Sequence, residues 1–194
     1  MGRIKEFEDK RALEKAMFLF WEKGYSNTSL KDLLDVMNIQ NGSFYNTFGN
    51  KRDLFIKALE SYEADFSLKR SMLFDSHGSF KEKIRLLFSH VLDRQKNTTC
   101  PKGCFLFNSV SAEVLEDRKI QQLVRKGVDS FEKFLEHQIR LAVDNNEVDK
   151  SVDPTYAAAA VISFIVGIMR LCVLNYSDLK FKEQTEYFLS SLKL

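Results

Sequence analysis

The fold of this chain is decided by residues 28–51, whose sequence is TSLKDLLDVMNIQNGSFYNTFGNK. Four apolar residues of this stretch recur with the spacing of one helix face: Leu30, Leu33, Leu34 and Met37. Ser29 and Asp32 have the spacing of a capping box at the start of that helix. Residues 37–39 leave room only for a turn, and a short polar segment, 40–46, follows it. The pattern therefore predicts two short helices joined by a tight turn.

Two short helices with such a turn are the arrangement of a helix-turn-helix, whose second helix enters the major groove of DNA. In that arrangement Ile39, Phe44 and Phe48 pack inward, and the polar side chains of the second helix face the DNA. An ordinary helical hairpin has the same periodicity. On the pattern alone this alternative stays open.

Residues within this stretch and on both sides of it fit a known family. They are Leu13, Ala16, Phe20, Gly24, the run Thr28-Ser29-Leu30, the run Gly42-Ser43-Phe44-Tyr45 with Phe48, and Asn50-Lys51 with Leu54 and Phe55. Together, residues 13–55 resemble the DNA-binding domain of the TetR family of transcriptional repressors. The resemblance implies an all-α homodimer in which a three-helix DNA-binding head is joined to a helical-bundle body. In the family that body dimerises, binds a small molecule and releases the operator.

The composition agrees with a helical protein. The 194 residues are 44% hydrophobic and include only two prolines and eight glycines, which interrupt helices. The net charge is +2, but Lys31, Lys51, Arg52 and other basic residues lie within the first 52 residues. The charged N-terminus has no signal-peptide pattern, and three cysteines do not make a disulfide framework. We therefore expect a cytoplasmic protein.

The resemblance assigns the DNA contacts to the helix-turn-helix. It implies that Tyr45 and Lys51 bind backbone phosphates, the lysine at a helix N-terminus that favours anions; the alternatives are a packed tyrosine and a solvated lysine. Asn41 stands where relatives often have Lys or Arg, so the operator sequence cannot be taken over from the family. The side-chain amides of Asn and Gln pair with adenine. The expected DNA-contacting residues are Thr28, Ser29, Leu30, Gln40, Asn41, Gly42, Ser43, Tyr45, Asn46, Thr47 and Lys51.

A break at residues 74–78, which include a glycine and small polar residues, is the best candidate for a domain boundary. We expect a head in residues 1–50, a connecting helix in 51–72 capped by Asn50, and a ligand-binding and dimerisation body in 73–194. In the body, a capping box at Ser79 starts a helix that ends near residue 97. A second amphipathic helix spans 120–145.

Residues 157–169 carry no charge and follow Asp153-Pro154, a helix-start pattern. Thirteen residues are too few to cross a bilayer, so we expect a helix buried on all sides and no membrane partner. In the family the last two helices pack against the partner's to form a four-helix interface; the alternative is burial within one chain. The expected dimer contacts are Ile165, Ile168, Phe181, Phe188 and Leu192.

Large aromatic rings on several body helices predict irregular apolar gaps, which suit an apolar or aromatic inducer. Arg170 ends the apolar helix and needs a partner, either a protein carboxylate or an anionic group of the ligand. His90 fits either a pocket or the surface. The expected pocket residues are Phe88, His90, Cys104, Phe105, Asn108, Phe131, Phe164 and Arg170.

Cys100 and Cys104 lie four residues apart, but no second pair or nearby histidine completes a zinc site, so we expect no metal and no cofactor. The run from Gly103 to Asn108 is similar to a signature of one branch of the family, in which the cysteine begins a cavity-lining helix. A few members of that branch sense oxidants or electrophiles through such a thiol. The alternative is a small residue that fills a helix start.

The expected function is that of a DNA-binding transcriptional regulator, most simply a repressor released from its operator by a small molecule. A thiol sensor of the same family is the alternative. A helical protein-interaction adaptor would keep the amphipathic helices but would not need the polar second helix beside Tyr45 and Lys51. An enzyme is not expected, because no catalytic triad, metal cluster, carboxylate pair or phosphate-binding glycine loop occurs in a suitable context.

Overall fold

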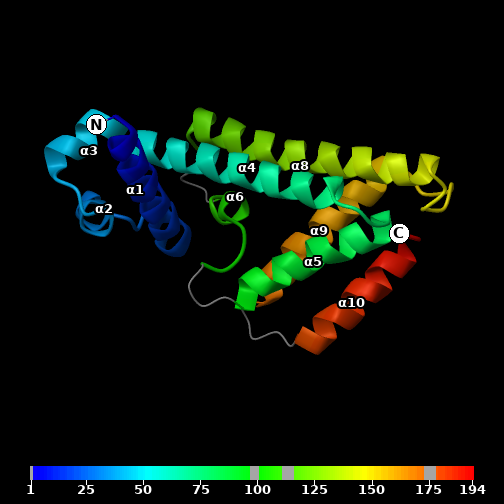
Figure 1. Ribbon diagram of the computed structural model, residues 1–194. Helices are drawn as coiled ribbons and strands as arrows, with labels where there is room; N and C mark the ends of the chain where they lie inside the picture. Colours follow the sequence, from blue (N-terminus) through cyan, green and yellow to red (C-terminus); the bar gives the residue numbers. More distant parts are fainter. Residues whose placement is uncertain (1, 97–100, 111–115, 173–177) are drawn as a thin grey trace. The chain divides into compact units, whose positions relative to one another are not determined.

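The computed structural model of the chain describes residues 2–96, 101–110, 116–172 and 178–194 (Figure 1). Every regular element in these ranges is an α-helix, which confirms the expected all-α class. The chain divides into two compact units, residues 1–65 with 105–126 and residues 66–104 with 127–194. Helices α4 (Lys51–Asp75) and α8 (Arg118–Asp144) each contribute residues to both units.

The first unit contains the predicted helix-turn-helix. It is built from α1 (Gly2–Lys23), α2 (Leu30–Met37), α3 (Asn41–Phe48), the start of α4, the short α6 (Phe105–Asn108) and the start of α8. Helix α2 has the predicted capping box, in which Ser29 and Asp32 each accept a hydrogen bond from the other's backbone N–H. It ends at Asn38, whose φ of 56° is the left-handed conformation of a helix stop. The turn thus forms as predicted.

Aromatic rings fill the core of the first unit. The Phe105 side chain is fully buried, and its ring centroid lies 5.8 Å from that of Trp21, 5.7 Å from that of Phe55 and 5.7 Å from that of Tyr62. Helix α6 is therefore part of the compact unit that holds the helix-turn-helix. This division differs from the predicted head of residues 1–50, because the packing joins α6 to segments far away in sequence.

The second unit holds α5 (Phe80–Lys96), α9 (Pro154–Cys172), α10 (Asp178–Ser191) and the remaining parts of α4 and α8. Its helix starts follow the predicted signals. Ser79 and Glu82 exchange hydrogen bonds at the start of α5, and Asp153 accepts the N–H groups of Thr155 and Tyr156 at the start of α9. Helix α4 extends to Asp75, three residues beyond the predicted end.

Two clusters organise the core of the second unit. In one, the buried Arg70 guanidinium lies 5.4 to 5.6 Å from the ring centroids of Phe66, Phe131 and Phe134 and donates a hydrogen bond to the Ser130 hydroxyl. In the other, three helices meet through rings: Phe164 of α9 stacks on Phe188 of α10 at 4.1 Å and contacts Phe88 of α5 at 5.8 Å.

Helix α9 requires a correction. It was expected to be buried on all sides, but Tyr156 is 77% exposed, and Ser163 and Gly167 are exposed as well. Of the 18 most apolar consecutive residues of α9, only 39% are buried inside the chain. By length and composition alone α9 could cross a membrane. The core helix of a soluble protein can have the same length and composition. One face of α9 therefore packs within the second unit and another face remains uncovered.

Candidate nucleic-acid interface

Helix α3 has one anchored face and one polar face. Phe44 is fully buried and Phe48 is 4% exposed, and the two rings hold the helix against the first unit. The opposite face carries a set of exposed residues with amide, hydroxyl or phenol groups: Asn41, Ser43, Tyr45 and Asn46, preceded by Gln40. Thr47 is half-buried, and Gly42 has open space around its backbone. Such a face can hydrogen-bond to base edges in a major groove.

The N-terminus of α4 lies next along the chain. Asn50 caps it as predicted, because its Oδ1 accepts the N–H of Asp53 at 3.0 Å. Gly49 precedes this cap with a φ of 81°, and a Cβ there would lie 2.7 Å from Asp53 Oδ2, so the tight junction of α3 and α4 requires glycine. The Lys51 side chain follows in the first turn, where helix N–H groups and the helix dipole favour an anion.

Lys51 is oriented by an aromatic ring. Its Nζ lies 4.4 Å from the ring centroid of Tyr25, a cation–π distance. Burial raises the pKa of Tyr25, which favours the neutral form of this ring. Tyr25 itself packs on Phe20 and Phe55. The contact between Lys51 and Tyr25 was not expected from the sequence.

Three predicted DNA contacts at the start of α2 differ in accessibility. Thr28 is fully buried, and its hydroxyl donates to the Gly24 carbonyl oxygen at 2.7 Å, so it closes the loop after α1. The Thr28 hydroxyl is therefore used within the protein and is not exposed to DNA. Ser29 is exposed and Leu30 half-buried, so both remain near the surface. Hydrogen bonds from the backbone and hydroxyl of Ser29 lower the pKa of Asp32 to about 2, which keeps a negative charge at this end of α2.

Arg52 is committed to an ion pair inside the first unit. Its guanidinium donates two hydrogen bonds to the Asp117 carboxylate, one of them from Nη2 at 2.9 Å. These hydrogen bonds lower the pKa of Asp117 to about 2. Arg52 is therefore paired with a carboxylate 65 positions away in the sequence. No sequence pattern indicated this ion pair.

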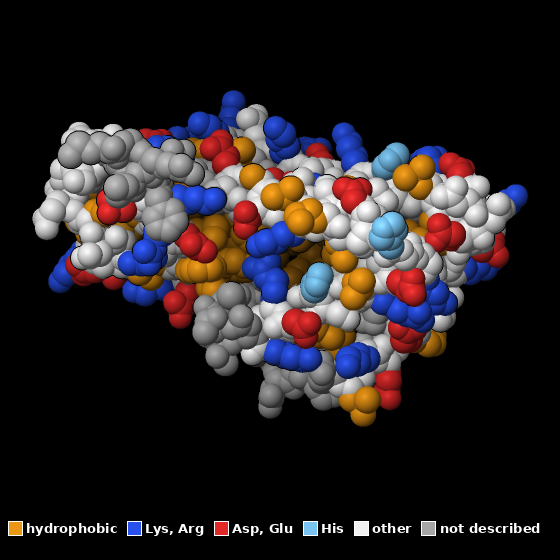
Figure 2. Space-filling model, viewed as in Figure 1, with side chains coloured by type: hydrophobic (Ala, Val, Ile, Leu, Met, Phe, Trp, Pro, Cys, Tyr) orange, Lys and Arg blue, Asp and Glu red, His pale blue; other side chains and the backbone are white. Residues whose placement is uncertain are grey.

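On the face drawn in Figure 2, no patch of basic side chains alone marks a DNA-binding surface. The face drawn in Figure 2 carries Lys and Arg side chains interspersed with Asp and Glu. The candidate site is therefore identified by its geometry: a polar exposed helix, α3, followed directly by the α4 N-terminus with Lys51.

The eight predicted pocket residues are divided between the units. Phe105 and Asn108 belong to the first unit, and the other six belong to the second. Within the second unit, Phe88 and Phe164 are in contact, whereas Phe131 belongs to the Arg70 cluster. His90 and Arg170 are exposed, so the prediction that they orient a ligand in an apolar interior is not supported by their burial.

The predicted dimer residues also separate into two groups. Ile165, Ile168 and Phe181 are at most 3% exposed in the single chain, so the protomer's own core covers them. Phe188 and Leu192 are half-buried. The strongly exposed apolar side chains of α9 and α10 are instead Tyr156, Leu179 and Tyr187, which are 71% to 79% exposed.

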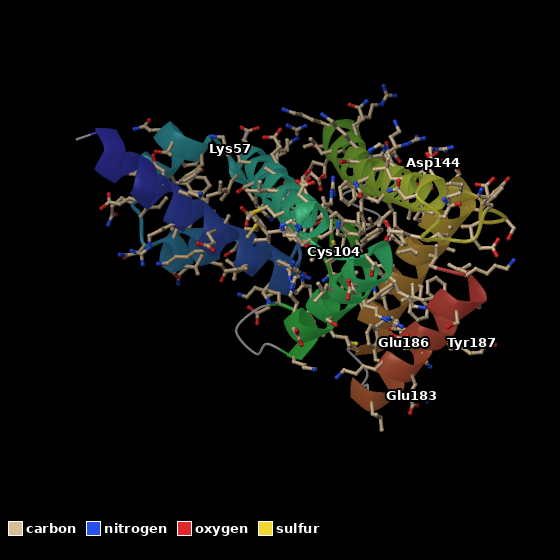
Figure 3. The ribbon with its side chains drawn as sticks, turned by 45° about the vertical axis from the view of Figure 1, so that its right-hand side comes forward. Lys57, Cys104, Asp144, Glu183, Glu186 and Tyr187 are labelled. Carbon is tan, nitrogen blue, oxygen red and sulfur yellow. The ribbon has the colours of Figure 1, made fainter. Side chains whose placement is uncertain are left out.

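The cysteines are only partly described. Cys104 and Cys172 are half-buried, and Cys104 lies directly before α6 (Figure 3). Cys100 lies outside the described residues. Within residues 2–96, 101–110, 116–172 and 178–194, no three His, Cys, Asp or Glu side chains are grouped to hold a metal ion.

Comparison with known proteins identifies both parts of the chain. Residues 12–58 match the family of bacterial regulatory proteins, tetR family, and residues 81–188 match the tetracyclin repressor-like C-terminal domain. The chain is 32% identical over 149 residues to the uncharacterized HTH-type transcriptional regulator YezE of Bacillus subtilis (strain 168), with 77% of each chain covered. It is 28% identical over 168 residues to the HTH-type transcriptional repressor ComR of Escherichia coli (strain K12), covering 86% of this chain and 80% of ComR.

A solved structure shares the fold. It is a cysteine mutant of the TetR family transcriptional regulator CifR complexed with 26-bp double-strand operator DNA, which matches with a TM-score of 0.83 and 22% identity. The match covers 93% of this chain and 94% of that one.

Proposed function

The chain belongs to the TetR family of transcriptional regulators, and from this premise we propose that it is a repressor whose α3 contacts operator bases and which a small molecule releases from DNA. The observation that carries the proposal is the division of α3 into a buried side with Phe44 and Phe48 and an exposed side of amides and hydroxyls. A helix held in this way presents hydrogen-bonding groups without losing its own packing.

Different residues of the site take different roles. Asn41 and Asn46 carry side-chain amides that pair with adenine, so they are proposed to select the sequence together with Gln40 and Ser43. Lys51 and Tyr45 are proposed to contact phosphates, which fix the position of the protein on the duplex.

The first test is selection of DNA fragments from a random pool, followed by gel shift on the selected duplex and on the promoter region of the chain's own gene. We expect one family of related sequences to be enriched. Asn41→Ala should change the enriched sequence, whereas Lys133→Ala, at an exposed position of α8 in the second unit, should not. If no sequence is enriched and no duplex shifts, the protein-interaction adaptor becomes the better explanation.

We propose a homodimer that uses the uncovered faces of α9 and α10. In the second unit Tyr156, Leu179 and Tyr187 are exposed apolar or aromatic side chains, and covering them would remove apolar surface from water. A two-fold dimer would also present two α3 helices to two half-sites. Light scattering at micromolar concentration tests the dimer, and a monomer would exclude it.

We propose an apolar or aromatic inducer that binds the second unit. The rings of Phe88, Phe164 and Phe188 support this proposal, since an aromatic ligand can pack edge-on or stacked against them. The inducer must bind the DNA-free state more tightly, because a ligand shifts an equilibrium only by its differential affinity. A thermal-shift screen followed by gel shift tests this. Release by strongly polar metabolites alone would refute the apolar site.

The thiol sensor is the second candidate. Cys104 is half-buried directly before α6, the helix whose Phe105 is buried in the core of the first unit. Oxidation or alkylation of this thiol would add bulk or polarity beside that helix. A Cys104→Ser protein that keeps the wild-type release from DNA under a mild electrophile would exclude the candidate.

A further inference from the structure

Helix α3 is weakly held by its own sequence. It has eight residues, well below the length at which an isolated helix is stable in water, and only Phe44 and Phe48 are buried. Its N-cap, Gln40, makes no capping hydrogen bond through its side chain. The orientation of α3 therefore depends on the few contacts made with it from outside.

One such contact comes from Lys57 of α4. Its Nζ donates a hydrogen bond of 2.9 Å to the carbonyl oxygen of Thr47, and it lies 5.6 Å from the centroid of the Phe48 ring. Thr47 is in the last turn of α3, where carbonyl groups carry the negative end of the helix dipole. A charged donor at this end satisfies an otherwise unpaired carbonyl and favours the helix electrostatically. Figure 3 labels Lys57 on the first part of α4.

The direction of Lys57 distinguishes it from Lys51. The two lysines are six residues apart on α4, so they lie about 120° from each other around the helix axis. Lys51 lies over Tyr25, whereas Lys57 reaches back to the end of α3. The two charges therefore serve different contacts.

We propose that Lys57 is a positioning residue for operator binding: it fixes the C-terminal end of α3 on α4 so that the exposed amides of α3 keep their register with the bases. The inference rests on the proposed role of α3. It assigns to Lys57 a contact within the protein rather than a contact with a phosphate. Loss of the lysine should therefore weaken base recognition more than general attraction to DNA, since base contacts need the exact placement of α3.

The test compares Lys57→Met with wild type on the selected duplex and on an unrelated duplex of equal length, at several salt concentrations. Methionine keeps an unbranched apolar side chain but removes the charge and the donor. We expect affinity for the selected duplex to fall about twofold to fivefold per protomer, the range of a charge at a helix end. Affinity for the unrelated duplex and the salt slope should stay unchanged. Lys57→Arg should restore most of the specific affinity, and Lys133→Met is the matched control.

A second measurement needs no DNA. Hydrogen exchange of the α3 amides in the free protein should be faster in Lys57→Met than in wild type or Lys133→Met. A salt slope reduced by about one per protomer would identify Lys57 as a phosphate contact and overturn the inference. Unchanged specific affinity or unchanged exchange would overturn it as well. If Lys57→Met does not fold, Lys57→Ala, which also removes the charge and the donor, gives the same comparison.

The two proposals fail in different ways. If the wild-type protein enriches no DNA sequence, the proposed function fails. The rate of amide hydrogen exchange in α3 still decides whether Lys57 fixes the helix.

Discussion

Lys51→Ala is the sharpest test of the proposed interface, because it separates a phosphate contact from a base contact. Lys51 occupies the first turn of α4, and its Nζ lies 4.4 Å from the Tyr25 ring centroid, so its charge is held in place at a helix N-terminus. Alanine retains the helix and the Asn50 cap but removes this charge. The effect should therefore appear in the electrostatic part of binding.

The magnitude follows from the number of contacts. Each phosphate contact contributes about 0.9 to the slope of log affinity against log salt. A dimer loses two contacts, so the slope should become shallower by about 1.8. When the salt concentration rises from about 50 mM to about 200 mM, the ratio of wild-type affinity to variant affinity should then fall about twelvefold.

Fluorescence anisotropy with the selected duplex and an unrelated duplex, from low to high salt, measures this effect. The loss should be similar on both duplexes, since a phosphate carries no sequence information. Lys133→Ala should follow wild type. Coinciding slopes for Lys51→Ala and wild type would show that the lysine makes no phosphate contact, whatever the change in affinity.

Phe105→Ala removes a fully buried ring that contacts three others, so the free energy of unfolding should fall by about 3–5 kcal/mol in urea denaturation at fixed protein concentration; a loss below about 1 kcal/mol would contradict the described core. Asp117→Asn removes a carboxylate whose pKa the Arg52 hydrogen bonds lower from 3.8 to about 2. Its stabilising contribution is present above the unfolded-state pKa and is lost as the pH falls through the folded-state pKa, so the variant should have a flatter stability curve between about pH 4 and about pH 2; superimposed curves would argue against the ion pair. Tyr187→Glu adds a charge at a side chain that is 79% exposed, so it should shift the dimer towards monomer in light scattering without loss of helical circular dichroism; an unchanged dimer would place the interface elsewhere.

Local signals in the sequence predicted the helix boundaries well. Ser29 with Asp32, Asn50 with Asp53, and Asp153 before Pro154 all form the expected caps, because each cap depends only on residues within three positions. The polar exposed face of α3 was predicted for the same reason, since the side on which a residue lies follows from helical spacing once Phe44 and Phe48 are anchored.

Features that depend on distant segments were not predictable in this way. The bond from Arg52 to Asp117 and the packing of Phe105 on rings of α1 and α4 each join segments far apart in sequence. The uncharged run of residues 157–169 predicted that Ile165 and Ile168 are buried, but composition cannot tell whether the residues that bury them come from the same chain or from a partner. Thr28 was assigned by family resemblance, and its burial follows from a bond to the Gly24 carbonyl oxygen that spacing does not reveal.

The membership of α6 in the first unit has a consequence for protein engineering. A chimeric regulator could be built by joining the DNA-binding head of one protein to the sensing body of another. Here a junction after residue 50 would separate Trp21 and its neighbours from Phe105, and a foreign side chain would have to fill that space. A functional graft should therefore transfer residues 105–126 together with residues 1–65, as two segments of one module.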